Sequence, residues 1–492
     1  MTETETDAAM EQLRADWEMV VGLEVHVQLR TRTKAFCACA TDFGAAPNVN
    51  TCPVCLALPG ALPVLNAHAV ELATRAALAL GCTVHPASVF ARKNYFYPDL
   101  PKGYQITQFD KPLATDGQVQ IGTRADGKAI CIGVTRVHIE EDAGKSIHDR
   151  FAGVTAIDLN RSGTPLIEVV SEPDMRSAEE AGAYLRVLKQ MLEYIDVSDV
   201  SMEEGSLRVD ANVSARRRGE TKLGTKTEVK NMNSFSGVER AVEVEFIRQV
   251  GELQAGRTIL QQTMLWDAGA GEVRPSRTKE GSHDYRYFPE PDLPPLVLAP
   301  DWIEQVRHDL PELPAARRLR FAKDYSLGEY DVDVLTASPH LADYFESVAR
   351  AHGDAKTAAN WVMGEVLARL RSTGQKLQEF RVRPADLAGL LGLVSAGVVT
   401  LTAAKQIFVR MIATGDPPAQ IAERDGLIRI DDEEQLAAWV DDVLLELSAE
   451  ATRYRQGETR LRGVLVGAVM KKSGGRADAR KVGQLLEARL ES

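Results

Sequence analysis

The sequence predicts an α+β fold in which an antiparallel sheet comes first and helices follow. Three observations predict it. From about residue 17 to residue 300, short stretches alternate apolar and polar residues with the period of two that is typical of strands. A proline-dense stretch at 287–300, YFPEPDLPPLVLAP, ends this pattern. After it, apolar residues recur at helical spacing in segments such as AKTAANWVMGEVLARLRS and LTAAKQIFVRMIATG.

The chain of 492 residues is long enough for two to four domains at roughly 150 residues each. We expect residues 1–16, which are acidic and polar, to form a flexible N-terminus. We assign 17–300 to the sheet domain, 301–412 to a helical domain and 413–492 to a helical tail. The N-terminus lacks the apolar core of a secretory signal, and no apolar run is long enough to span a bilayer. We therefore expect a cytoplasmic protein without membrane contact.

Charge is distributed unevenly along the chain. The net charge of -12 argues against a general nucleic-acid-binding protein. From Ala451 to Ser492, however, ten Lys or Arg stand against four Asp or Glu, a net charge of +6. The stretch just before it, DDEEQLAAWVDDVLLELSAE, is strongly acidic. This abrupt change predicts that the last segment contacts a polyanion, and an ordinary solvated helix surface is the alternative.

Four of the six cysteines form two close pairs. Cys37 and Cys39 make a C-x-C pair, and Cys52 and Cys55 make a C-x-x-C pair after a loop of twelve residues. Disulfides are rare in cytosolic proteins. Four thiolates joined by a loop rich in Gly, Pro and Asn match the ligand number and reach of a tetrahedral structural zinc site. Four protein ligands leave no open position, so the predicted Zn²⁺ stabilises the fold; four unconnected cysteines are the alternative.

Glu24 and His26 lie in GLEVHVQL, which alternates like a half-buried strand. Side chains at i and i+2 of a strand point to the same face, about 7 Å apart. A carboxylate and an imidazole at that spacing can converge on one cation. The same pattern fits a plain solvated face, and this strand alone does not decide between the two.

Three more stretches place acids on strand faces. In VTRVHIEEDAGKS, Glu141 shares a face with Val137 and Ile139. In GTPLIEVVSEPD, Glu168 interrupts an apolar run, where a buried carboxylate needs a partner or a cation. In MEEGSLRVDANVSA, Asp210 lies on the polar face of a further strand. Together they predict a broad sheet with a working polar face, and oxygen ligands with one imidazole favour Mg²⁺ or Mn²⁺, which bind ATP phosphates.

The stretch ARKNYFYPDLPKGYQITQ is dense in aromatic and polar residues and suits a binding loop. Lys93 and Lys102 are available there for a phosphate or a charged substrate. Aromatic packing beneath a surface loop explains its Tyr and Phe residues equally well.

Several of these stretches carry a family resemblance. They are GLEVHVQL, RKNYFYPDLPKGYQITQ, HIEEDAGKS, DLNRSGTPLIEVVSEPD, MEEGSLRVDANVS, KTEVKNMNSF and DYRYFPEPDLPP, with AANWVMGEV and the terminal VMKK. In this order they resemble the B subunit of the bacterial and archaeal glutamyl/aspartyl-tRNA amidotransferase. The resemblance runs from about Trp17 to the C-terminus. One departure is GRADARKV, where Ala479 stands at the place of a proline that the family often has.

The resemblance implies a fold and an activity. The fold is a cradle built on an antiparallel sheet, followed by a helical domain and a helical tail that touches tRNA. The enzyme uses ATP to phosphorylate the side-chain carboxylate of Glu on tRNA(Gln) or of Asp on tRNA(Asn). Ammonia then displaces the phosphate, which gives Gln or Asn on the correct tRNA.

The resemblance also assigns roles to residues. The catalytic Mg²⁺ is held by four of them: Glu24, His26, Glu141 and Glu168. Contacts to ATP, or to the residues behind the metal site, fall to Glu204, Asp210, Glu228 and Lys230. The ammonia route passes two catalytic lysines, Lys93 and Lys102. Structural Zn²⁺, which one branch of the family carries, is held by Cys37, Cys39, Cys52 and Cys55.

The source of ammonia lies outside this chain, because no nucleophile motif for a glutaminase is visible in it. The resemblance implies two partner subunits in a heterotrimer, an amidase-type glutaminase A subunit and a small C subunit that wraps the other two. Mischarged tRNA is the substrate, and the basic tail contacts it through phosphates and backbone shape. A non-discriminating synthetase is a further candidate partner.

Two other functions fit the same residues. A metal-dependent ligase that joins a small-molecule carboxylate to an amine would use the acid-lined sheet but not the helical extension. A non-catalytic tRNA-binding scaffold would keep zinc as a staple and leave the acids solvated. The sequence does not decide between Glu-tRNA and Asp-tRNA as the substrate.

Overall fold

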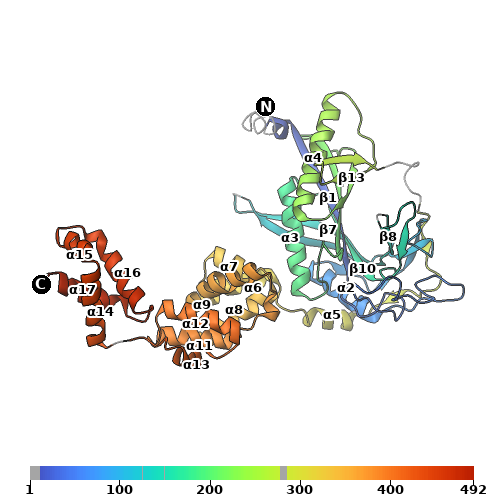
Figure 1. Ribbon diagram of the computed structural model, residues 1–492. Coiled ribbons are helices and arrows are strands. Elements are labelled where there is room, and N and C mark those ends of the chain that lie inside the picture. Colours follow the sequence, from blue (N-terminus) through green and yellow to red (C-terminus); the bar gives the residue numbers. More distant parts are fainter. Residues whose placement is uncertain (1–11, 125, 149, 277–284, 431, 492) are drawn as a thin grey trace. The chain divides into compact units, whose positions relative to one another are not determined.

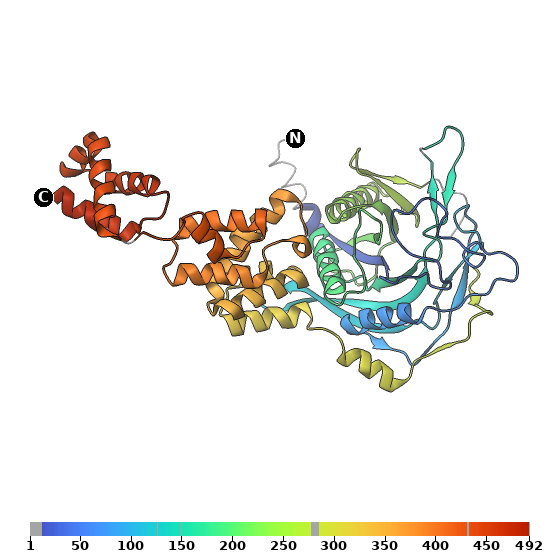
Figure 2. The same cartoon turned by 60° about the horizontal axis from the view of Figure 1, so that its bottom comes forward.

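The structure is a computed structural model that describes residues 12–124, 126–148, 150–276, 285–430 and 432–491 (Figure 1, Figure 2). The chain divides into two compact units between Pro314 and Ala315. The first unit contains the sheet and the second is helical, so the predicted α+β class is confirmed. Most of the expected flexible N-terminus lies outside the described residues, and 12–16 are helical.

Nine strands of the described chain form the main sheet, in the order β14-β13-β12-β11-β1-β10-β7-β6-β2. All neighbouring strands are antiparallel except β12 and β13, which are joined by a long helical crossover and pair in parallel. The strands are β1 (Trp17–Gln28), β2 (Thr83–Val84), β6 (Ala114–Thr123), β7 (Ala129–Glu141), β10 (Pro165–Ser171), β11 (Leu207–Arg217), β12 (Thr227–Met232), β13 (Thr263–Asp267) and β14 (Glu272–Pro275).

Two long helices, α3 (Ala178–Tyr194) and α4 (Phe235–Gln254), cover one face of this sheet (Figure 1). Each begins at a serine whose hydroxyl accepts a hydrogen bond from a backbone N–H of the first turn, Ser177 for α3 and Ser234 for α4. The odd-numbered residues of β1, such as Val25, are fully buried. The alternate residues therefore point to the other face of the sheet, which no long helix covers in the described part of the first unit.

Smaller elements complete the first unit, and among them α2 (Ala67–Ala79) packs into the same apolar core as the buried face of the sheet. They are α2 and α5 (Pro300–His308), the three-stranded sheet β15-β4-β5 and the pairs β16-β3 and β8-β9. Ile303 and Val306 of α5 are buried in the core of the first unit, which therefore continues past the sequence boundary at 300. The bounds of these strands are β3 (Ala87–Ser88), β4 (Ala91–Asn94), β5 (Tyr104–Thr107), β8 (Lys145–Ile147), β9 (Ala156–Asp158), β15 (Phe288–Pro289) and β16 (Leu296–Val297).

The second unit contains two clusters of buried apolar residues, one from Phe321 to Ala422 and one from Leu436 to Leu490. The first cluster extends past the predicted boundary at 412, because α13 packs on α11 and α12.

The last helix begins at Ala479, where the family often has proline, and Asp478 caps it by accepting hydrogen bonds from two backbone N–H groups of its first turn. The first cluster is formed by α6 (Pro314–Tyr325), α7 (Glu329–Leu335), α8 (Pro339–His352), α9 (Ala355–Trp361), α10 (Leu367–Thr373), α11 (Pro384–Ser395), α12 (Leu401–Thr414) and α13 (Pro418–Arg424). The second cluster is formed by α14 (Glu433–Glu446), α15 (Ser448–Arg455), α16 (Arg462–Lys472) and α17 (Ala479–Glu491). Across the described ranges, no helix has the length and apolar character needed to cross a membrane.

Candidate active site

Three neighbouring strands bring acids and imidazoles together on the open face. The register pairs His26 of β1 with Glu168 of β10, and Glu168 in turn with His138 of β7. Glu140 lies two residues beyond His138 on β7 and therefore points the same way. We call these four residues the His–Glu cluster. Pairing of the three strands thus brings ionisable side chains that alternate along each strand into one group.

The atoms of the His–Glu cluster lie close enough to share one cation. His26 Nε2 is 3.3 Å from Glu168 Oε2 and 3.6 Å from Glu140 Oε1. One ligand atom from each of these three residues lies within 4.8 Å of the other two. His138 Nε2 is 3.4 Å from the same oxygen of Glu168. One imidazole nitrogen with carboxylate oxygens is a donor set that Mg²⁺ or Mn²⁺ accepts, so these residues fit the predicted ion.

The imidazoles of the cluster balance the charge of its acids. Burial lowers the pKa of His138, but the charge of Glu168 and the hydrogen bonds to Glu140 and Glu168 outweigh it and raise that pKa to about 9. The pKa of His26 is also raised above its ordinary value, against the effect of burial, by Glu168 and Glu140. Burial raises the pKa of Glu168, yet His138 and His26 hold it well below its usual range. The two imidazoles and the buried carboxylate of Glu168 therefore stabilise one another's charged forms.

The cluster lines a cavity of about 490 Å³, a size typical of ligand sites. Aromatic rings form another part of its lining, where Phe109 and Tyr287 stack with their ring centres 4.0 Å apart. Lys93 Nζ lies 4.8 Å from the ring centre of Tyr285. Burial lowers the pKa of Lys93, but the charge of Glu140 outweighs it and raises the pKa, so this amine remains protonated. Lys93 was expected at the site, and the structure brings it there.

Most of the remaining residues that the sequence singled out also line this cavity. Glu24 accepts a hydrogen bond of 2.9 Å from Asn212. Lys230 forms ion pairs with Asp210 and with Glu228, and their charges raise its pKa despite burial. Glu204 is different. Its side chain is exposed on the turn before β11 and does not line the cavity.

Glu141 and Lys102 are not part of the His–Glu cluster. Glu141 Oε1 accepts a hydrogen bond of 3.0 Å from the backbone N–H of Ile106 and forms an ion pair with Lys102. Both residues line a second cavity of about 260 Å³, beside Cys37 and Cys55. The reason is the alternation of side chains along β7. Glu141 lies on the same strand face as buried Val137 and Ile139, as the sequence predicts. It therefore points away from the face that carries Glu168. The carboxylate beside His26 and Glu168 is that of Glu140.

Sequence reasoning missed three residues of the site. His138 and Glu140 were not singled out, although they are two residues apart in RVHIEE and so share one face of the strand. Arg136, two residues before His138, also lines the cavity. A strict alternation along this stretch would have found all three, but only after the buried face had been identified.

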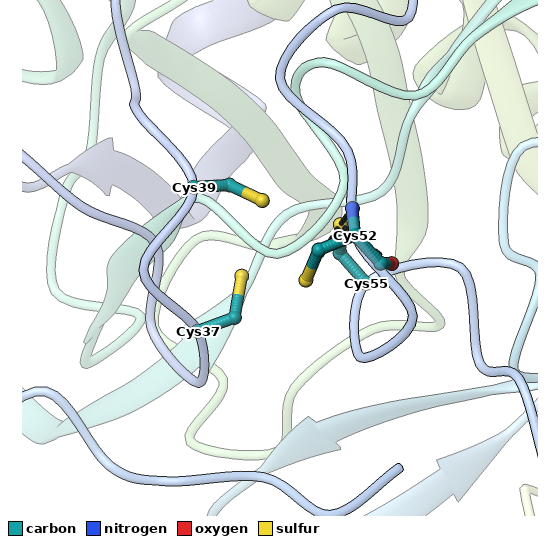
Figure 3. A group of neighbouring side chains, drawn as sticks. All are labelled: Cys37, Cys39, Cys52 and Cys55. Atoms are coloured by element: carbon teal, nitrogen blue, oxygen red, sulfur yellow. Dashed lines mark hydrogen bonds between the residues drawn. The ribbon is translucent and has the colours of Figure 1, made fainter.

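The four predicted zinc ligands converge from two segments (Figure 3). Their sulfur atoms lie within 4.8 Å of one another. A hydrogen bond from Cys37 and the charge of Lys34 lower the pKa of Cys55 to about 4, whereas burial and a hydrogen bond to Cys52 raise that of Cys39 to about 11. Four sulfur donors at this spacing fit a tetrahedral Zn²⁺ site.

Comparison with known proteins covers nearly the whole chain. The family model described as the GatB/GatE catalytic domain matches residues 19–304, and the model described as the GatB domain matches 343–490. A relative from Chlorobium chlorochromatii is 52% identical over 476 residues, which is 97% of this chain and 100% of the relative. A relative from Geotalea daltonii is 50% identical, with 97% and 100% covered.

Both relatives bear the same name, that of the B subunit of aspartyl/glutamyl-tRNA(Asn/Gln) amidotransferase, as does one from Prosthecochloris aestuarii at 49% identity over 96% of this chain and 98% of that relative. The name describes one component of a larger enzyme that acts on tRNA. The resemblance noted in the sequence is thereby confirmed, and the chain belongs to the family of aspartyl/glutamyl-tRNA(Asn/Gln) amidotransferase B subunits.

Proposed function

We propose that this chain is the subunit that converts Glu-tRNA(Gln), Asp-tRNA(Asn) or both into Gln-tRNA(Gln) and Asn-tRNA(Asn), with ATP as the source of energy. The single observation that carries the proposal is the buried His–Glu cluster inside a cavity of about 490 Å³. A solvated polar face would not bury two carboxylates against each other, because buried charges are costly unless a cation compensates them. Such an enzyme works where tRNAs are charged, so we place it in the cytoplasm.

The reaction has two steps. An oxygen of the side-chain carboxylate bonds to the γ-phosphorus of ATP as the bond to the β,γ-bridging oxygen breaks, and ADP leaves with that electron pair. Ammonia then attacks the acyl carbon, the bond to the phosphate oxygen breaks, and inorganic phosphate leaves. A proton lost from nitrogen completes the amide. Both steps build negative charge on phosphate oxygens, which the site has to stabilise.

Residues of the cavity supply the environment for these steps. His26, Glu140 and Glu168 would hold Mg²⁺, which when bound neutralises phosphate charge. Glu24, held by Asn212, lies next to them on β1 and is a further candidate ligand. Lys230, which pairs with Asp210 and Glu228, fixes these two acids in the cavity wall where we place the nucleotide. The aromatic rings beside Lys93 form an apolar part of the cavity wall.

Ammonia reaches this chain from partners. We propose an amidase-type glutaminase A subunit as the source and a small C subunit as the third member of the complex. The cavity beside the cysteines, with the Glu141–Lys102 ion pair in its wall, is the candidate entry for ammonia. Zn²⁺ on the four cysteines would fix the loops that form that wall.

The test uses the chain in complex with its A and C partners. We would supply Glu-tRNA(Gln) or Asp-tRNA(Asn) with labelled ATP and Mg²⁺, withhold glutamine, and measure ADP. We expect ADP only with a mischarged tRNA, and about 10³-fold less of it from Glu168→Gln. Glu272→Gln, an exposed acid on β14, is the matched control and should keep full activity.

Other outcomes would favour the alternatives. Activity that survives truncation after about Ile412 would favour a small-molecule carboxylate–amine ligase. Tight tRNA binding with no ADP from either aminoacyl-tRNA would favour a non-catalytic scaffold.

A further inference from the structure

Arg136 lines the cavity, but its side chain forms no hydrogen bond with the described residues. It lies on β7 two residues before His138, so its side chain points to the same face as the His–Glu cluster. Its nearest acidic atom is Glu168 Oε1, 3.9 Å from Nη2, which is too long for a hydrogen bond. Within the described residues its guanidinium makes no hydrogen bond, and the side chain is 34% exposed. The N–H donors of this cavity-lining guanidinium thus have no protein acceptor among the described residues.

The other cations near the cavity are engaged. Arg208 donates two hydrogen bonds to Asp142, of 2.8 and 2.9 Å. Lys230 is held between two carboxylates, and Lys93 lies against the ring of Tyr285. Among the described residues that line this cavity, Arg136 is the arginine, and its donors are available to a ligand. Planar guanidinium groups match the oxygens of phosphate groups, to which they donate two parallel hydrogen bonds.

We propose that Arg136 binds the phosphoryl group during its transfer from ATP to the substrate carboxylate. This inference rests on the proposed function and adds a catalytic residue to it. As the bond from the γ-phosphorus to the bridging oxygen breaks and the bond to the carboxylate oxygen forms, charge spreads over the three non-bridging oxygens. Arg136 donates hydrogen bonds to those oxygens from the side of Glu168. The distant contact with Glu168 orients the guanidinium without occupying its donors.

A purely structural role for Arg136 makes a different prediction. If the guanidinium only balanced Glu168, its removal would disturb stability and the arrangement of the His–Glu cluster. It would not weaken the binding of a transition-state mimic relative to the binding of ADP. The two roles can therefore be separated by kinetics and by ligand binding.

The kinetic test compares Arg136→Lys and Arg136→Ala with the wild-type complex in the ADP assay. We expect kcat to fall about 10²- to 10³-fold, as when one donor to a developing charge is removed, with KM for ATP changed less than about 3-fold. Added guanidinium chloride should restore part of the activity of Arg136→Ala. Arg274→Gln, an exposed arginine at the edge of the same sheet, is the matched control and should keep its activity.

The binding test does not depend on turnover. The affinity for ADP with aluminium fluoride, which mimics the transferring phosphoryl group, should fall at least about 10-fold more in Arg136→Lys than the affinity for ADP alone. Equal losses for both ligands, or a raised KM with unchanged kcat, would overturn the inference. A wild-type complex that forms no ADP would instead refute the proposed function, and an active wild type with equally active Arg136 variants would refute this inference alone.

Discussion

Glu168 in the first unit and Glu346 in the second are both buried carboxylates, but the cations around them differ in kind. Glu346 accepts hydrogen bonds from Arg317, Arg320, Arg350 and the hydroxyl of Tyr325. Glu168 meets only the imidazoles of His26 and His138 at hydrogen-bond range among the described residues, with Arg136 farther away. Guanidinium groups keep their charge at any ordinary pH, whereas an imidazole can lose its proton to solvent and then bind a metal ion. A carboxylate with permanent partners stabilises the fold, and one with exchangeable partners is available for chemistry.

Surface cations of the basic segment 451–492 also differ in whether they have acidic partners. Several of its cations are already paired, such as Lys472 with Asp442 and Glu446 at 2.8 Å, and Arg489 with Asp441 at 2.9 Å. The acidic stretch 431–450 thus neutralises part of the basic segment 451–492. Exposed cations of 451–492 whose side chains have no acidic partner in the described part of the chain are Arg455, Arg460, Lys471 and Arg480, and of these Arg455 donates to two backbone carbonyls. The net charge of the segment therefore overstates the charge that a polyanion would meet.

The largest expected effect comes from exchanging the two carboxylates for amides. Glu168→Gln should lower ADP formation about 10³-fold, because the metal site loses a charged ligand, and leave stability unchanged or raised. Glu346→Gln should leave activity per folded molecule unchanged but lower the free energy of unfolding by about 2 kcal/mol, since three guanidinium groups lose their acceptor. Activity assays and urea unfolding of each variant measure both. If the two phenotypes were reversed, the comparison would be wrong.

Removal of zinc should affect the fold of the first unit. Cys55→Ser should abolish stoichiometric Zn²⁺ and lower the stability of that unit by about 3 kcal/mol or more, part of the roughly 10 kcal/mol that structural zinc provides in small domains. Cys131→Ser is the matched control, because Cys131 is half-buried outside the cluster and should retain both metal and stability. Metal analysis and thermal unfolding check this. Equal metal content in the two variants would exclude the cysteine site.

We expect an intermediate effect from removing unpaired cations of the basic segment 451–492, measured as tRNA binding. Changing Lys471 and Arg480 to Gln should weaken tRNA binding about 10-fold and reduce the salt dependence of the affinity by about 1.5 in its logarithmic slope, because two phosphate contacts are lost. The matched double variant at Lys472 and Arg489 should have a smaller effect, since these cations are engaged with acids. Binding isotherms at several salt concentrations compare them. Equal losses in both pairs would show that intramolecular pairing does not limit contact with tRNA.

The smallest effect is on the pH dependence of stability. Burial raises the pKa of Glu346, but hydrogen bonds from Arg320 and Tyr325 and the charges of Arg320 and Arg350 outweigh it and lower the pKa to about 2. A lowered pKa in the folded state contributes stability above the unfolded value of 4.5, and this contribution is lost as pH falls toward 2. Allowing for partial exposure of the arginines, we expect about 1 to 2 kcal/mol. The free energy of unfolding in urea, measured from about pH 6 to about pH 3, should therefore decline more steeply for the wild type than for Glu346→Gln.

Much of the candidate site follows from short-range patterns in the sequence. Alternation along single strands placed Glu24, His26 and Asp210 on polar faces, and the spacing of two cysteine pairs located the metal-binding loops. These predictions succeed because the direction of a side chain in a strand depends on its own position along that strand. The family resemblance added the ligands of the metal and nucleotide as a set, which alternation alone could not group.

The tertiary structure decided what depends on contacts between distant segments. The sequence placed Glu141 on the same face as Val137 and Ile139, but only the pairing of β7 with β10 shows that this is the buried face, so that Glu140, His138 and Arg136 reach the cavity. Likewise, the cations of the tail could be counted in the sequence, whereas their pairing with α14 required the helices to be packed. The physical reason is the same in both cases. The sequence by itself determines which residues share a face of a strand or helix, and tertiary packing determines which face is covered and which charges meet.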